Sequence, residues 1–362
     1  MAEKYTKLKT HRMVLRDAVP LDMPFTLFVD PSNYCNFKCS FCPRNQADFV
    51  KYAGSYKHMS IRLFSKIVDD LQAFSGRLKV LRLFYLGEPL LCPDFLAILK
   101  LACDKYIANR IEISTNASLL TEEYSRRILN IASCYAGDIY IRVSVYSIYQ
   151  QKNEMITKNG IYVDKIRDNV ATFYHMKNAM PEVRDRVKIY AKMLKSYSEE
   201  DVAFVKRYEY IVDEAELEEP MEWSGDQQRN LLGEVYSEKV VTSLRSKVMP
   251  KVCAYPFHTL AIQSDGKVVC CCVDWKRKTY VGDVNTESLY DIWHGKLMHD
   301  LRYAHLSGDR HKIESCAKCL KLPAGGVYDA DNMDNLSVAE YLRRYKSRYG
   351  AEWLGNEEKH RN

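Results

Sequence analysis

Short apolar runs alternate with amphipathic stretches from Leu21 to about Lys195, and this alternation constrains the fold more than any other feature. Short apolar runs predict strands, whereas apolar residues three and four positions apart predict helices. Ser60, Thr121 and Ser198 stand as N-caps where three of the helices are expected to begin. The β/α repeat of five or six units predicts an α/β fold, a partial (β/α)6 TIM barrel with its helices outside. The predicted strands are Phe25–Asp30, Lys79–Gly87, Arg110–Ala117, Asp138–Ser147 and Arg186–Leu194.

The rest of the chain predicts a smaller second unit. The residues after Glu214 are acidic and irregular, which is typical of a connector. Two short strands joined by the turn Ser264–Gly266, then a helix capped by Thr286, predict a β-hairpin-plus-helix domain. The predicted division is an N-terminal segment at 1–20, the barrel at 21–212, a connector at 213–249, the small domain at 250–325 and a helical tail at 326–362.

Composition narrows the compartment and the partners. The net charge of +6 is spread along 362 residues, so we expect no nucleic-acid partner. No apolar run approaches the roughly 18 residues of a membrane span, and the first residues lack the apolar core of a signal peptide. We therefore expect a cytoplasmic protein with no membrane partner. Because cytoplasmic thiols stay reduced, the twelve cysteines favour metal or redox sites over disulfides. Cys92, Cys103 and Cys134 stand alone in apolar stretches, which predicts that they are buried as small apolar side chains.

Three of the cysteines, Cys35, Cys39 and Cys42, lie within eight residues directly after the first predicted strand. Barrels of this type carry their chemistry at the C-terminal ends of the strands, which is where this loop falls. Three thiolates leave a structural zinc one ligand short, and a C-x3-C-x2-C loop gives His58 no obvious place as the fourth. An iron–sulfur cluster held by three thiolates instead keeps one iron open to another molecule. Zinc remains the less favoured alternative.

The stretch Cys-Asn-Phe-Lys-Cys-Ser-Phe-Cys resembles the C-x3-C-x-Φ-C signature of the radical S-adenosylmethionine (SAM) enzymes, with Phe41 before the third cysteine. Leu86–Pro89 is similar to the Gly-Gly-Glu-Pro loop of that family, with Leu86 in place of its first glycine. The resemblance implies that the loop backbone receives the amino group of SAM. It also implies that a [4Fe–4S] cluster binds and reductively cleaves SAM to a 5′-deoxyadenosyl radical. The loop residues that match are Gly87, Glu88 and Pro89.

Two further segments resemble SAM contacts of the same family. Ser114, Thr115 and Asn116 end the third predicted strand, and Ser144 lies on the fourth. The resemblance implies that they contact the carboxylate and ribose of SAM. Many relatives carry an acidic residue two positions after the serine, where this chain has Tyr146. That departure puts the ribose contact in question.

A second cysteine group resembles the SPASM/twitch extension of radical SAM enzymes. Twelve residues separate Cys253 from Gly266, four more precede Cys271, and a C-x2-C pair follows after the predicted helix. The resemblance implies one auxiliary [4Fe–4S] cluster, with Cys270 or Cys272 as alternatives to Cys271. A zinc ribbon could use the same residues. The implied ligands are Cys253, Cys271, Cys316 and Cys319.

The resemblance favours an oxidoreductase that takes hydrogen from a sugar-like or aminocyclitol-like small molecule and passes the second electron to the auxiliary cluster. An external donor such as flavodoxin or ferredoxin would supply the first electron. Arg142, Lys188 and Lys192 are candidates to act near a substrate hydroxyl. Two alternatives are modification of a peptide or protein, and a zinc-bound interaction module without catalysis. A third is epimerisation, with a hydrogen-donating thiol from Cys92, Cys103, Cys270 or Cys272.

Overall fold

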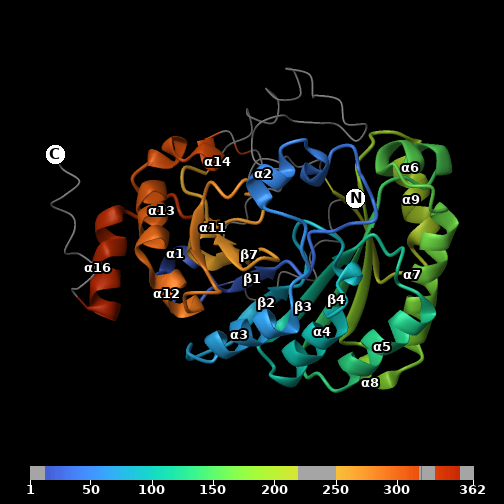
Figure 1. Ribbon diagram of the computed structural model, residues 1–362, viewed down its shortest axis with the longest axis horizontal. Coiled ribbons are helices and arrows are strands. Elements are labelled where there is room, and N and C mark those ends of the chain that lie inside the picture. The colour runs from blue at the N-terminus through green and yellow to red at the C-terminus, as the bar shows by residue number, and fades with distance from the viewer. Residues whose placement is uncertain (1–12, 219–249, 318, 320–330, 351–362) are drawn as a thin grey trace.

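The computed structural model describes residues 13–218, 250–317, 319 and 331–350, and these build one nine-stranded sheet in the order β6-β5-β4-β3-β2-β1-β7-β8-β9 (Figure 1). The first six strands are parallel, which confirms the predicted α/β partial barrel. They are β1 Thr26–Val29, β2 Leu78–Arg82, β3 Ala108–Thr115, β4 Asp138–Val145, β5 Val187–Leu194 and β6 Glu214–Glu218.

Helices line one face of this sheet. Those that follow the strands are α3 Ile61–Leu71, α4 Phe95–Asp104, α5 Glu122–Ser133, α7 Val163–Asn178 and α9 Glu199–Tyr208. Helices α3, α4, α5 and α7 pack side by side (Figure 1). The three predicted N-caps are confirmed, because Ser60, Thr121 and Ser198 accept backbone hydrogen bonds from the first turns of α3, α5 and α9. Two short helices, α6 Gln150–Thr157 and α8 Pro181–Arg184, were not predicted.

Alternation along the strands separates an apolar face from a polar one. On β4 and β5 every second side chain, such as Ile141 and Ile189, is buried in the core beneath the helices. The side chains between them, such as Arg142 and Lys192, are half-buried on the opposite face, away from the helices that follow the strands. We call it the helix-free face, a name that refers to the described residues only. Because parallel register pairs residues that point the same way, this face continues across β2 to β6.

Two predictions about the barrel strands were wrong. Residues Glu214–Glu218, assigned to an irregular connector, form the sixth strand and pair with β5. Glutamate has a low strand propensity, but Glu218 is stabilised here by contacts with Arg142 and Lys192 on the neighbouring strands. Strand β2 ends at Arg82, so the predicted stretch up to Gly87 is mostly loop. The connector residues 219–249 lie outside the described part of the chain.

The predicted hairpin is confirmed, and it extends the barrel sheet. Strands β7 Thr259–Ile262 and β8 Lys267–Val269 are antiparallel, and β7 pairs in parallel with β1. A further strand, β9 Tyr280–Asp283, was not predicted. The single helix expected after Thr286 is two, because Gly295 separates α12 Leu289–His294 from α13 Lys296–Leu306, and the cap of α12 is Ser288. Short helix α11 Tyr255–His258 begins two residues after Cys253, and short helix α14 Glu314–Ala317 contains Cys316.

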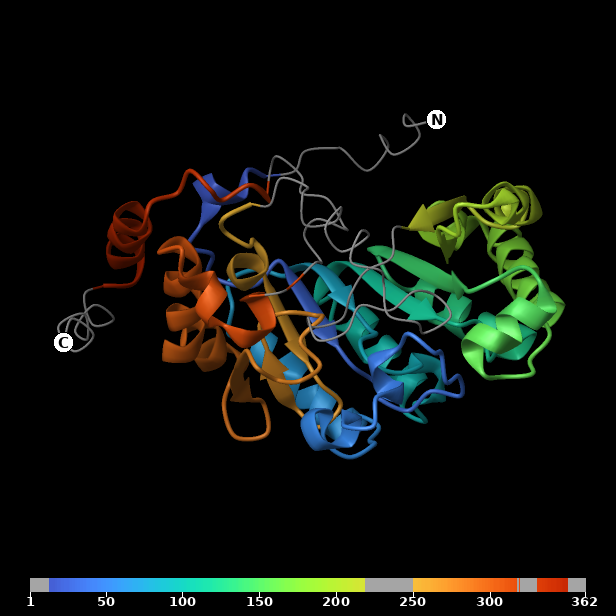
Figure 2. The same cartoon turned by 90° about the horizontal axis from the view of Figure 1, so that it is seen from above.

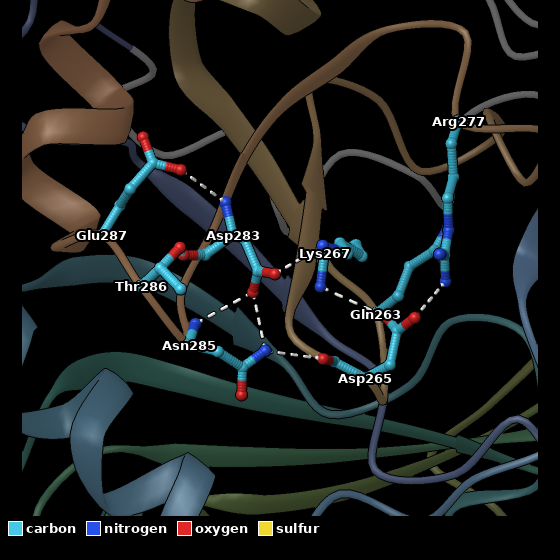
Figure 3. Close-up of polar contacts among 8 residues, drawn as sticks. All are labelled: Gln263, Asp265, Lys267, Arg277, Asp283, Asn285, Thr286 and Glu287. Carbon is cyan, nitrogen blue, oxygen red and sulfur yellow. Dashed lines mark hydrogen bonds and ion pairs between the residues drawn. The ribbon is translucent and has the colours of Figure 1, made fainter.

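A polar network fixes the β7–β8 turn (Figure 3). Gly266 has φ +92°, and a Cβ there would lie 2.2 Å from the Asn285 side chain. Asn285 donates to the Asp265 carbonyl at 2.8 Å and to Asp283 at 2.6 Å. Arg277 donates to the Asp265 carboxylate at 2.7 Å and to a carbonyl of helix α2 Phe49–Ala53, which follows the first cysteine group. The hairpin is therefore tied to the loop region that carries Cys35, Cys39 and Cys42.

The C-terminal helix α16 Val338–Tyr349 lies at the end of the molecule opposite α6 and α9 (Figure 2). It confirms the predicted helical tail within the described residues. Arg344 donates to the carbonyl of Arg16 at 2.6 Å in helix α1 Leu15–Ala18, and Arg348 contacts Asp22 at 2.6 Å. The N-terminal segment is therefore held by a helix more than 300 residues later. None of the described helices combines the length and the hydropathy needed to cross a membrane.

Candidate functional site

The first cysteine loop is shaped by hydrogen bonds to its own backbone. The buried guanidinium of Arg44 donates to the carbonyls of Cys35 at 3.0 Å and Phe37 at 3.1 Å. Asn45 donates to the Cys39 carbonyl at 2.7 Å. Because these donors satisfy carbonyls inside a tight loop, the loop is held in one conformation before any ligand binds. The three thiols therefore belong to a pre-formed site.

The chemistry of this donor set fits an iron–sulfur cluster. Cys35, Cys39 and Cys42 are free thiols that are buried or half-buried. Burial, and then the charge of Glu88, raises the pKa of Cys35 to about 12. Burial, and then the charges of Cys42 and Cys35, raises the pKa of Cys39 as well. Such thiols lose their protons when a cationic metal centre takes them as ligands. In the described residues, no group of three or more His, Cys, Asp or Glu side chains surrounds a single metal ion; in a [4Fe–4S] cluster, each thiolate binds a different iron.

The loop around Gly87 packs directly on the cysteine loop. The Glu88 backbone N–H donates to the Tyr34 carbonyl at 2.7 Å, one residue before Cys35. A Cβ on Gly87 would lie 2.1 Å from the Ser32 carbonyl oxygen and 2.3 Å from that of Tyr34. This approach requires glycine, because a methyl group has no room. The position predicted to bind SAM therefore touches the loop predicted to bind the cluster.

Asp30 is a residue of this site that sequence analysis missed. It follows β1, is 1% exposed, and its Oδ1 accepts from the Leu86 backbone N–H at 3.2 Å. Its Oδ2 is buried without a hydrogen-bond partner among the described residues. Burial raises the pKa of Asp30 to about 7. The available signal was an acidic side chain at the end of an otherwise apolar strand, where chemistry-bearing residues collect.

The side chain of Glu88 joins two predicted SAM-binding segments. Its Oε1 accepts from the Thr115 hydroxyl at 2.7 Å, and its Oε2 accepts from the Asn116 backbone N–H at 2.8 Å. Asn116 in turn donates to Asn36 at 2.9 Å and lies 4.0 Å from Cys35 Sγ. Burial raises the pKa of Glu88 to about 7. The structure thus brings Cys35, the Gly87 loop and the end of β3 together through one buried carboxylate.

The remaining predicted positions surround the same loop. Ser114 and Ser144 are half-buried on the helix-free face, near the ends of β3 and β4. The Phe41 ring lies 5.8 Å from that of Tyr146. Tyr146, the position at which the chain departs from the family pattern, lies near Cys39 and opposes the rise in the pKa of that thiol. Pro89 begins a buried turn directly after Glu88.

The second cysteine group also comes together in the fold. Burial, and then the charge of the Cys253 and Cys319 thiolates, raises the pKa of Cys316 to about 12. Burial and the charges of Cys316 and Cys253 raise the pKa of Cys270 as well. Cys271 interacts with both of its neighbours and with Cys253. Six thiols therefore gather here, and both Cys270 and Cys271 approach Cys253.

An apolar cluster connects the Gly87 loop to the second cysteine group. Tyr85 and Leu86, which precede Gly87, pack in it with Phe28, Trp275 and Cys272. Cys271 and Cys319 are half-buried against the same cluster. The Tyr85 hydroxyl donates to the Cys271 carbonyl at 3.5 Å. The loop predicted to hold SAM and the second cysteine group are thus direct neighbours.

Other predicted candidates have different surroundings. Cys92 and Cys103 are buried as expected of small apolar side chains, whereas Cys134, expected to be buried, is exposed at the end of α5. His58 stacks on Tyr34 with ring centroids 4.6 Å apart. Burial alone therefore separates Cys92 and Cys103 from Cys134.

Comparisons with known proteins agree with this site. A model of the radical SAM superfamily matches residues 29–202, and a model of the SPASM iron–sulfur cluster-binding domain matches residues 253–320. Both cysteine groups lie inside the matched segments. No curated protein matches the chain.

Solved structures with TM-scores above 0.5 share the fold, and others are similar at lower scores. SuiB of Streptococcus suis bound to SAM is 18% identical over 87% of this chain and 75% of its own, with TM-score 0.57. Native anSMEcpe with bound AdoMet is 16% identical over 89% and 95%, with TM-score 0.53. BtrN in complex with AdoMet and 2-DOIA is 15% identical over 85% and 98%, with TM-score 0.49.

The two matched domains define the cofactors. The first binds SAM and a [4Fe–4S] cluster, and the second binds auxiliary iron–sulfur. From its sequence matches and its fold, the chain is a radical SAM enzyme and belongs to the radical SAM superfamily with a C-terminal SPASM domain.

Proposed function

We propose that this enzyme oxidises a polar small molecule by two electrons, the first lost with a hydrogen atom and the second lost through the auxiliary cluster. Its cluster and SAM, when bound, supply a 5′-deoxyadenosyl radical that can break an unactivated C–H bond. An external donor such as flavodoxin or ferredoxin would reduce the enzyme. The residues of the chain bind and orient the substrate, and they take up the proton.

Three cysteines would hold the first cluster, namely Cys35, Cys39 and Cys42. The backbone at Gly87, Glu88 and Pro89 would receive the amino group of SAM, because the Glu88 side chain is already engaged with Thr115 and Asn116. Ser114, Asn116 and Ser144 would contact the rest of SAM. The auxiliary cluster would take Cys253, Cys271, Cys316 and Cys319.

Lys192 would accept the proton when an alcohol carbon becomes a ketone. Its side chain is 19% exposed on the helix-free face, level with Ser144 in the sheet register. Burial lowers the pKa of Lys192 and the nearby Arg142 adds to this, although Glu218 opposes it. A lysine with a lowered pKa is a better proton acceptor near neutral pH.

The observation that carries this proposal is the apolar cluster between the two sites. Leu86, next to Gly87, packs in the same cluster as Cys272, and Cys271 and Cys319 lie against it. A second electron can reach an auxiliary cluster efficiently only when that cluster is close to the substrate radical. The packing of the SPASM cysteines beside the SAM loop supports such a route.

The test is product analysis with a matched auxiliary-site variant. The anaerobically reconstituted enzyme is incubated with SAM, a reductant and a panel of amino sugars, cyclitols and sugar phosphates, and products two hydrogens lighter are sought. We expect Cys316→Ala/Cys319→Ala to retain SAM cleavage and to lose the oxidised product. The decisive case is a substrate that suppresses uncoupled turnover. If SAM is cleaved in its presence and no product oxidised by two electrons forms, the result would contradict oxidation.

Epimerisation is the second candidate, favoured by the place of Cys272. This buried thiol packs with Tyr85 and Leu86, and its charge would be felt by Arg82 on the helix-free face. A thiol there could return a hydrogen atom to a substrate radical. Turnover in deuterium oxide would then place one deuterium on carbon, and Cys272→Ala would abolish that label.

A further inference from the structure

Three arginines surround one buried glutamate on the helix-free face, and we call Arg82, Arg110, Arg142 and Glu112 the cationic cluster. Glu112 Oε2 accepts from Arg82 Nε at 2.9 Å, and its Oε1 lies 2.8 Å from Arg110 Nη2. Arg142 Nη1 lies 4.0 Å from Oε2. The glutamate side chain is 6% exposed, whereas the arginines are 24–28% exposed.

The cationic cluster carries more positive than negative charge. Arg142 also contacts Glu218 at 2.9 Å, but Lys192 shares that carboxylate at 3.1 Å. Among the residues that the structure describes, the three arginines thus outnumber the two carboxylates that they contact, even without Lys192. Glu216 faces Lys192 from β6. Burial opposes ionisation of Glu112, yet the three guanidinium groups hold its pKa at about 2. Half-buried surplus charge of this kind favours a bound counter-ion.

The cationic cluster lies next to the proposed SAM site. Glu112 and Arg142 precede Ser114 and Ser144 by two residues on β3 and β4. Alternate residues of a strand face the same side about 7 Å apart, so Glu112 and Arg142 form the next layer on the same face, and Arg110 lies one layer further from Ser114. The arginine side chains are partly exposed, although Arg110 Nε itself is buried without a hydrogen-bond partner among the described residues. A substrate within reach of SAM would therefore meet partly exposed arginine side chains.

We propose that the cationic cluster binds an anionic group of the substrate, a phosphate or a carboxylate. The proposal deepens the proposed function and rests on it, since it names the substrate class of the same site. A guanidinium donates two parallel N–H groups to two oxygens of either anion. Several such donors on adjacent strands would hold the anion and leave the uncharged part of the substrate beside SAM.

Anion binding without turnover tests the proposal. The reconstituted, oxidised enzyme is saturated with SAM and titrated calorimetrically with inorganic phosphate, with succinate and with neutral glucose at fixed ionic strength. We expect phosphate or succinate to bind at least 10-fold more tightly to the native enzyme than to Arg110→Gln, and glucose to show no such difference. Which anion responds distinguishes a phosphate from a carboxylate substrate.

Two further variants keep the result interpretable. Arg126→Gln removes an exposed arginine of α5 that pairs with Glu122, and it should bind anions like the native enzyme. Arg110→Lys keeps the charge if Arg110→Gln fails to fold, and the loss of the fork should weaken binding at least 3-fold. Equal anion affinity in the native enzyme and the Arg110 variants would overturn the proposal. So would anion binding that disappears once SAM is bound, because the arginines would then serve SAM.

A second assay distinguishes a failure of this proposal from a failure of the proposed function. SAM cleavage is assayed on the same preparations with dithionite and no substrate. If SAM is not cleaved, the proposed function fails whatever the anion data show. If SAM is cleaved and no anion binds through Arg110, the substrate class alone is wrong.

Discussion

The Thr115 hydroxyl donates a hydrogen bond of 2.7 Å to the Glu88 carboxylate, and this contact ties the Gly87 loop to the end of β3. The same carboxylate accepts from the backbone N–H groups of Leu90 and Asn116. A buried carboxylate with three donors acts as a brace, because each donor would be costly to leave unpaired. The loop that would receive SAM is therefore positioned by a side chain that does not itself face the ligand.

Glu88→Gln should loosen this brace. Glutamine offers one oxygen and one NH2 group, so one of the donors now at Glu88 would face another donor. We expect a loss of about 1–3 kcal/mol in the free energy of unfolding and roughly 10-fold weaker SAM binding. Glu122→Gln, which alters an exposed pair with Arg126, should change stability by less than about 0.5 kcal/mol. Equal behaviour of the two variants in denaturation and SAM titration would show that the brace is unimportant.

Asp30 makes stability depend on pH. Its pKa is raised from 3.8 to about 7, so the folded state prefers the protonated form. That contribution is fully present below pH 4 and is lost as the pH rises through 7. In Asp30→Asn the amide oxygen can still accept from Leu86, and no donor is lost at the unpartnered Oδ2.

We therefore expect the stability of Asp30→Asn, relative to native enzyme, to rise between pH 5 and 7 by at most about 1.4 kcal/mol per pH unit. Above pH 8 the difference should be constant. Chemical denaturation of both proteins across this range measures it. A difference that is flat from pH 5 to 8 would show that Asp30 titrates normally.

Gly87→Ala should separate SAM cleavage from cluster assembly. The added Cβ would lie within 2.3 Å of two carbonyl oxygens of the cysteine loop, so the two loops must move apart. We expect at least a 10-fold loss of SAM cleavage with iron content retained. Gly160→Ala is the matched control, since its Cβ meets nothing within 4 Å. Full activity in Gly87→Ala would mean that the close approach is dispensable.

The parts of the fold that could be predicted from the sequence are those that depend on local contacts. Three N-caps, five strands and the first cysteine loop depend on neighbouring residues, and they were predicted. Strand β6 was missed because its glutamates are stabilised by Arg142 and Lys192, which are distant in sequence. The pairing of β7 with β1 joins residues more than 200 positions apart. Tertiary contacts of this kind override local propensity.

The candidate site also divides into features set by local sequence, which were predicted, and contacts between distant residues, which were not. Cysteine spacing identified both thiol groups, but it could not show that Tyr85 touches Cys271 or that Asp30 holds Leu86. The run Cys270–Cys272 follows the end of β8 at Val269, so its thiols have no regular strand geometry, and both Cys270 and Cys271 approach Cys253. The helix end at Gly295 was missed, since the apolar spacing continues across it.

Arg277→Ala should weaken the attachment of the hairpin to the cysteine loop. Arg277 donates to Gln263, Asp265 and the Ala53 carbonyl, and its side chain is 17% exposed (Figure 3). We expect a loss of about 1–3 kcal/mol in the free energy of unfolding, because three acceptors lose a donor. Arg126→Ala on the surface of α5 should cost less than about 0.5 kcal/mol. An equal loss in the free energy of unfolding for both variants would argue that Arg277 does not attach the hairpin to the cysteine loop.

The central claim is that Cys35, Cys39 and Cys42 hold a cluster that cleaves SAM, and 5′-deoxyadenosine formation tests it most directly. The anaerobically reconstituted enzyme is given SAM and dithionite, and the product is quantified by chromatography. We predict formation of 5′-deoxyadenosine by the native enzyme and by Cys134→Ala, which changes an exposed lone cysteine, and none by Cys39→Ala. A native enzyme that forms no 5′-deoxyadenosine, or a Cys39→Ala variant as active as native, would contradict the account.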